Sequence, residues 1–156
     1  MQAVLALHLP VDVIHANDWH AALCCVYLRS ELYCHYENFK NARSVLTIHN
    51  IGYQGVFGKE NLYWTGLGWG YFHFNCIEYY DQLNFLKAGV MTAHMVNAVS
   101  PTYANEILDP WFSHGLDPIL RDRSYKLSGI LNGIDTINYD PETDKDIFAN
   151  FSAKEP

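Results

Sequence analysis

Signatures of several common functions are missing from this sequence of 156 residues. No G-x-G-x-x-G run follows a predicted strand and no P-loop occurs, so nothing indicates a glycine-rich phosphate-binding loop. Lys and Arg number only 10 against 17 Asp and Glu, and they are scattered, which argues against a nucleic-acid partner. No apolar run approaches the ~20 residues that a membrane-spanning helix needs, so we expect no membrane partner.

Cysteine is scarce, and its four residues show no metal-binding or redox spacing. Cys24 and Cys25 are adjacent, while Cys34 and Cys76 stand apart, so no C-x-x-C motif occurs. We expect free, buried thiols in a reducing compartment. The N-terminal segment lacks a basic leader and a small-residue cleavage site, which favours a cytoplasmic location.

Short apolar strands alternate along the chain with helical segments. Strands are predicted at 11–16, 44–48, 95–99 and 127–131, and helices at 19–29, 81–93, 102–108 and 116–123. Residues 31–42 predict a loop or frayed helix, 53–80 an irregular aromatic excursion, and the residues beyond 135 a polar surface segment. This alternation predicts an α/β fold: a Rossmann-like parallel sheet flanked by helices, with right-handed crossovers.

Polar side chains follow three of the predicted strands. Asp18 comes just after the first, His49 and Asn50 follow the second, and Asn132 follows the fourth. In open α/β sheets the ligand crevice lies at the carboxyl ends of the strands. The neutral His49 imidazole can donate to or accept from a sugar hydroxyl, and an Asn carboxamide offers one acceptor and two donors. These positions therefore predict a site that hydrogen-bonds a polar small molecule.

Each of these residues also fits a purely local role. Asp18 stands where a helix N-cap is wanted, and His49 could be tied to neighbouring backbone. Asn50 and Asn132 are common turn residues, and Asn132 precedes a glycine. From spacing alone, both interpretations stay open for all four residues.

Three other features have structural explanations. His15, Asp18 and His20 lack the i, i+4 spacing of a helical zinc pair, so no metal is predicted. Lys87, inside an apolar helix, is expected to reach solvent. The aromatic stripe is expected to pack internally rather than to form a sugar platform; it comprises Tyr63, Trp64, Trp69, Tyr71 and Phe72.

Five motifs in sequence order resemble the bacterial glycogen synthases and plant starch synthases, which are retaining, ADP-glucose-dependent glucosyltransferases of the GT-B fold. They are HANDWH (15–20), TIHNIGYQGVF (47–57), QLNFLKAG (82–89), VSPTYA (99–104) and LSGILNGID (127–135). The resemblance covers nearly the whole chain. It implies that residues 1–156 are part of an incomplete N-terminal domain, without the Lys-x-Gly-Gly-Leu loop and the C-terminal nucleotide-binding domain.

The resemblance also implies roles for individual residues. His49 looks like the residue that contacts the transferred glucose and helps to stabilise the reacting centre, and Asp18 matches an active-site aspartate near the sugar and the acceptor. Asn132 looks like a second ligand of the glucose hydroxyls, while Asn50 and Tyr53 flank the cleft. The family often has His-Ala-His-Asp-Trp, and in this sequence Asn17 replaces the second histidine.

The implied function is that of a glycogen or starch synthase fragment. The intact enzyme would move glucose from ADP-glucose to the non-reducing end of an α-1,4-glucan with retention, without a cofactor, in the cytoplasm or in a plant plastid. The fragment alone is expected to be nearly inactive, because the cations that stabilise the departing ADP are missing. Alternatives are a non-catalytic glucan-binding module or a truncated gene product, with the aromatic segment 53–80 as its sugar platform, or a related GT-B transferase that uses another nucleotide sugar.

Overall fold

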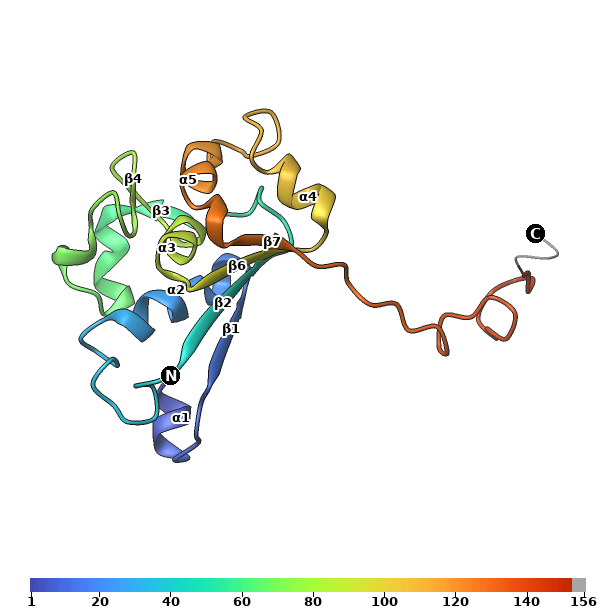
Figure 1. Ribbon diagram of the computed structural model, residues 1–156, viewed down its shortest axis with the longest axis horizontal. Coiled ribbons are helices and arrows are strands. Elements are labelled where there is room, and N and C mark those ends of the chain that lie inside the picture. Colours follow the sequence, from blue (N-terminus) through green and yellow to red (C-terminus); the bar gives the residue numbers. More distant parts are fainter. Residues whose placement is uncertain (153–156) are drawn as a thin grey trace.

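A four-stranded parallel sheet organises the computed structural model, which describes residues 1–152 (Figure 1). Its strands are β1 (Val13–Asn17), β2 (Arg43–Ile48), β6 (Met95–Ala98) and β7 (Leu127–Gly129), in the order β1-β2-β6-β7. All three pairings are parallel, and each strand overlaps its predicted range. The predicted α/β class and parallel sheet are therefore confirmed.

The register of the sheet separates an apolar face from a polar one. Ala16, Leu46, Val96 and Leu127 form one row across the four strands, and the first three are fully buried in the core. One residue further along each strand, the row reads Asn17, Thr47, Asn97 and Ser128. Since successive side chains point to opposite faces, the second row lies on the face away from the core.

Helices α2 (Asp18–Arg29), α3 (Phe85–Thr92) and α5 (Asp117–Asp122) lie on the same side of the sheet, as Figure 1 shows. Helix α3 approaches α2 closely at Gly89, where an added Cβ would stand 2.8 Å from the Cβ of Ala22. The remaining α-helices are α4 (Pro101–Glu106) and the short α1 (Gln2–Ala6), which was not predicted. Helix α4 begins one residue before its predicted range, because the Ser100 hydroxyl accepts from the backbone N–H of Tyr103 and Pro101 occupies the first turn.

The segment expected to be irregular contains a second sheet. Strands β3 (Val56–Gly58), β5 (Gln82–Asn84) and β4 (Glu78–Tyr79) pair antiparallel in that order, and two 3-10 helices, η1 (Lys59–Thr65) and η2 (Trp69–Tyr71), lie between β3 and β4. The prediction that a helix begins at residue 81 was wrong, because residues 82–84 form β5. Asn84 then caps α3 by accepting from the backbone N–H of Lys87.

Lys87 is fully buried, so the prediction that it reaches solvent was wrong. Its Nζ donates to the carbonyl oxygens of Phe74 and Glu78, and it lies 4.6 Å from the centroid of the Phe74 ring. Burial lowers the pKa of this ammonium group, and the nearby Glu78 carboxylate partly opposes that effect. The lysine thus ties the segment before β5 to helix α3.

Beyond β7, which follows the 3-10 helix η3 (Ser124–Lys126), the chain leaves the body as an extended segment (Figure 1). Within residues 1–152, no helix is long and apolar enough to cross a membrane.

All four cysteines are free thiols, as predicted, but only Cys25 and Cys76 are buried, while Cys34 is exposed. Burial raises the pKa of Cys25 and of Cys76 to about 11, so both thiols stay protonated near neutral pH.

Candidate functional site

The carboxyl ends of β1 and β2 are joined through the side chain of Asp18. Its Oδ1 accepts a hydrogen bond from the backbone N–H of His49 at 2.8 Å and a longer one from that of Asn50 at 3.4 Å. The N-cap interpretation was wrong, because Asn17 occupies the cap position of α2 and makes no side-chain cap bond. Asp18 instead adopts a left-handed conformation (φ +53°) at the start of α2, and its carboxylate crosses to the neighbouring strand end.

The ring of His49 is held by the residue that precedes Asp18. Nε2 of His49 lies 2.9 Å from Oδ1 of Asn17, and both side chains are exposed at the strand ends. A carbonyl oxygen can only accept, so this contact places the proton of the neutral ring on Nε2. Nδ1 then presents a lone pair that can accept a hydrogen bond from a ligand hydroxyl.

Asn50 fills the turn role that was one of its two interpretations. Its Oδ1 accepts from the backbone N–H of Gly52 at 2.9 Å, which closes an Asx-type turn directly after the strand. The next backbone N–H, of Ile51, donates to the hydroxyl of Tyr103 at 2.9 Å. Burial raises the pKa of that hydroxyl, which therefore stays neutral and holds the turn near neutral pH.

A pocket of about 580 Å³ adjoins this turn. Its walls are the turn 52–57 with Trp19, Tyr79, Tyr80, Gln82 and His114, so the exposed Tyr53 lies on its rim. The volume falls within the about 300–1,000 Å³ typical of small-molecule sites. Aromatic side chains and neutral amides dominate the walls, which suits an uncharged polar ligand with one apolar face.

Beneath the pocket, Gln54 is buried and its amide is fully engaged. Nε2 donates to the carbonyl oxygens of Ile51 at 3.3 Å and of His114 at 3.1 Å, while Oε1 accepts from Nδ2 of Asn84 at 2.7 Å. These bonds join the turn after β2, the loop before α5 and the cap of α3. Three hydrogen bonds thus hold the floor of the pocket in place.

Gly55 determines how close the turn can come to Trp19. It has φ +64°, and an added Cβ would stand only 2.4 Å from the indole ring. Both the backbone conformation and the contact therefore require glycine. Trp19 in turn stacks on His20, with ring centroids 3.8 Å apart.

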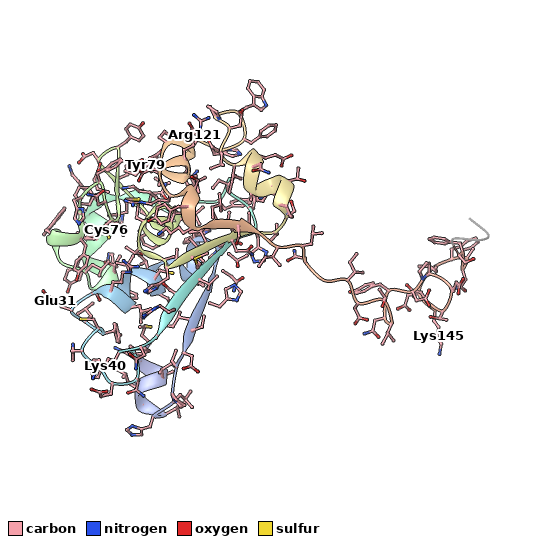
Figure 2. All side chains as sticks on the ribbon, viewed as in Figure 1. Glu31, Lys40, Cys76, Tyr79, Arg121 and Lys145 are labelled. Carbon is pink, nitrogen blue, oxygen red and sulfur yellow. The ribbon has the colours of Figure 1, made fainter. Side chains whose placement is uncertain are left out.

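His114 reaches the pocket from the loop between α4 and α5 and was missed by the sequence analysis. An added Cβ at Gly52 would lie 3.6 Å from two atoms of its ring, so the imidazole stands beside the Asn50 turn. The hydroxyl of Tyr79 donates to the Gly115 carbonyl at 2.7 Å and fixes this loop; Figure 2 shows Tyr79 between the small sheet and α5. The sequence signal that could have found this loop is the His114-Gly115 pair, because a glycine after a polar residue is typical of a turn. In the structure both residues have positive φ, +49° and +87°.

The structure brings together Asp18, His49 and Asn50, with Tyr53 at the adjoining pocket. Asn132 does not join this group. It is exposed in the extended segment that follows β7, and β7 is the edge strand at the opposite side of the sheet from β1. Pairing with β6 continues as far as Ile130, whose N–H donates to the Ala98 carbonyl at 2.9 Å. The glucose-binding role implied for Asn132 stays a prediction. Within the described range 1–152, no cluster of metal-ligating side chains is found.

Comparison with known proteins identifies the family of this chain. Residues 1–122 match the family described as the starch synthase catalytic domain. The chain belongs to the starch synthase family. It is 45% identical over 152 residues to the glycogen synthase of Thermosipho melanesiensis, covering 97% of this chain and 31% of the relative. It is 48% identical over 138 residues to that of Thermodesulfovibrio yellowstonii, covering 88% of this chain and 28% of the relative.

Among solved structures, the chain resembles the catalytic domain of Starch Synthase IV from Arabidopsis thaliana, solved with ADP and acarbose bound. The TM-score is 0.85 with 33% identity, over 99% of this chain and 32% of that one. The predicted family is thereby confirmed, and the predicted α/β fold has its counterpart in a starch synthase catalytic domain. This synthase-family chain spans about a third of the length of the relatives that it matches.

Proposed function

We propose that the chain forms the acceptor-side part of a glycogen or starch synthase active site. The whole enzyme would transfer glucose from ADP-glucose to the non-reducing end of an α-1,4-glucan, with retention. Support comes from relatives that are glycogen synthases and from the solved relative with ADP and acarbose bound. The observation that carries the proposal is that Asp18 holds the His49 backbone and Asn17 holds its ring, at the turn that leads into a pocket of about 580 Å³.

In this proposal His49 contacts the transferred glucose. Its Nδ1 accepts from a sugar hydroxyl, because Nε2–H is engaged by Asn17. Asp18 sets the position of the histidine backbone and leaves its second oxygen for the sugar or the acceptor. A preorganised pair of this kind stabilises charge at the reacting carbon without reorganising during the reaction.

The glucan acceptor would lie in the pocket, with one sugar face on Trp19 and its hydroxyls near Tyr53. Asn50, which closes the adjoining turn through Oδ1, would offer its Nδ2 to a hydroxyl at the pocket edge. Aromatic rings suit the apolar face of a pyranose, and amides suit its hydroxyls. Asn132 would supply a second contact to the glucose if residues 130–134 turn back toward the strand ends in the whole enzyme.

The diphosphate of the donor would be bound elsewhere. Neither Lys nor Arg lines the pocket, and leaving ADP needs positive charge to stabilise it. We therefore assign residues 1–156 to the N-terminal domain and nucleotide binding to a separate C-terminal domain. The enzyme would act in the cytoplasm, or in the plastid of a plant.

A chimera tests the proposal. Residues 1–156 would replace the matching segment of the Thermosipho melanesiensis glycogen synthase, and glucan elongation would be followed by ADP release. We expect activity in the chimera, a large loss of turnover with His49→Ala, and unchanged thermal unfolding. A chimera that folds but releases no ADP would favour the non-catalytic glucan-binding module. Equal losses of turnover and stability with His49→Ala would refute the role of that residue.

A further inference from the structure

A second, smaller hollow lies beside the candidate site. It has a volume of about 270 Å³, and its walls include Tyr27, Phe57, Asn61, Trp64 and Phe85. Phe57 lines both this hollow and the larger pocket. The Phe57 ring lies 5.8 Å from that of Trp19 and 5.1 Å from that of Phe85. A continuous aromatic surface therefore connects the two hollows.

The outer end of this surface is unusually exposed. The stripe was expected to pack internally, but only Tyr71 and Phe72 pack against a core cluster. Tyr63 and Trp64 are 80% and 81% exposed, and their rings meet edge to face at 5.3 Å. Trp64 is therefore an exposed aromatic side chain that also lines a hollow.

Polar groups beside Trp64 are suited to hydroxyls rather than to charged or purely apolar ligands. Asn61 donates through Nδ2 to the Gly58 carbonyl at 3.1 Å and to Glu60 at 3.2 Å, so its Oδ1 can accept from a ligand hydroxyl. Tyr27 lends its ring while its hydroxyl donates to the Thr65 carbonyl at 2.6 Å. An aromatic face with a neutral amide acceptor beside it is the combination that fits a sugar ring.

We propose that Trp64 and Asn61 form an outer subsite for the same glucan chain whose end occupies the larger pocket, with Phe57 between the two. The inference rests on the proposed function for the identity of the ligand. It adds a dependence on glucan length, because only a chain that crosses Phe57 reaches Trp64. Two linked contacts make the second one intramolecular, so long glucans gain affinity that short ones lack.

Calorimetric titration of the whole chain with maltotriose and with maltoheptaose tests this. Trp64→Ala should weaken maltoheptaose binding about tenfold and leave maltotriose binding unchanged. Trp64→Phe keeps an aromatic face and should restore most of the affinity. Trp111→Ala is the matched control, since Trp111 is 86% exposed and lines neither hollow. Circular dichroism would show that the variants fold, as expected for such exposed side chains.

The outcomes separate the two proposals. The outer subsite would be overturned if Trp64→Ala changed maltoheptaose affinity no more than Trp111→Ala does, or if it weakened the binding of both glucans equally. In either case, maltotriose binding by the unchanged chain would still support the larger pocket. If the unchanged chain bound neither glucan, both proposals would fail. If Trp64→Ala instead abolished a concentration-dependent dimer in sedimentation without changing glucan binding, the occupant would be a second copy of the chain and the glucan subsite would be refuted.

Discussion

Gly55 and Gly66 provide a matched pair for measuring how the pocket wall is built. Both have left-handed backbone, with φ +64° and +71°. An added Cβ at Gly66 meets nothing within 4 Å, whereas at Gly55 it would stand 2.4 Å from the Trp19 ring. Replacing each by alanine thus separates the cost of the conformation from the cost of the contact.

The expected magnitudes follow from these two terms. A left-handed alanine costs about 1 kcal/mol, so Gly66→Ala should lower the free energy of unfolding by that amount. Gly55→Ala adds about 1–3 kcal/mol for overpacking against Trp19, which is itself confined by Phe57 and Phe85. Its total should be about 2–4 kcal/mol. Both variants restrict the unfolded chain equally, so that effect cancels in the difference.

Urea unfolding followed by far-ultraviolet circular dichroism would measure both variants. The double variant Gly55→Ala with Trp19→Ala completes a mutant cycle, in which removal of the ring should recover the contact cost. Equal destabilisation by Gly55→Ala and Gly66→Ala, or no recovery in the double variant, would refute the close approach of the turn to Trp19.

Three further predictions concern side chains. Asn17→Leu removes the acceptor for Nε2–H, so the neutral His49 ring should populate both tautomers, which two-bond ¹H–¹⁵N spectra distinguish. Asn17→Asp keeps an acceptor and should keep the proton on Nε2. Unchanged spectra in Asn17→Leu would contradict the placement of the proton on Nε2. Burial lowers the pKa of Lys126 to about 8, so between about pH 8 and 10.5 the unfolded chain binds more protons than the folded chain, and stability should rise with pH there. The difference in free energy of unfolding between the unchanged chain and Lys126→Met, measured by urea titration, should therefore grow in favour of the unchanged chain from pH 7.5 to 9.5. A constant difference would contradict this. Lys87→Met leaves the Phe74 and Glu78 carbonyls without the lysine donor and should lower the free energy of unfolding by about 1–3 kcal/mol. Backbone hydrogen exchange in residues 72–79 should become faster. Exchange rates equal to those of the unchanged chain would show that the lysine does not hold this segment.

The main sheet was predictable because its strands are local patterns. A β-branched run such as Ser44–Ile48 followed by turn residues marks a buried strand wherever it occurs, and Ser100-Pro101 marks a helix start through its own hydrogen bond. The small sheet was not predictable in this way. Its hairpin turns through Tyr80 and Asp81, both with positive φ, where Asn-Gly would have given a clear signal.

The candidate site was predictable only in part, for the same physical reason. Residues at strand ends are placed by the sheet, so Asp18 and His49 could be grouped before their contact was known. His114 and Gln54 reach the pocket through loop conformation and buried amide bonds, which no periodic pattern encodes. The burial of Lys87 likewise depends on two carbonyls from residues 74 and 78, whose positions follow from the tertiary fold.

Asn17 shows how a departure from the family pattern can keep the local chemistry. The motif that often reads His-Ala-His-Asp-Trp has Asn17 in place of its second histidine, and the carboxamide oxygen accepts from Nε2 of His49 at 2.9 Å. A neutral imidazole at this position would also offer one acceptor nitrogen, so the type of hydrogen bond is retained. The difference is that a carboxamide does not titrate near neutral pH, whereas an imidazole becomes a donor at both nitrogens when protonated. In this chain the hold on the His49 ring therefore persists at acidities that would break it if residue 17 were histidine.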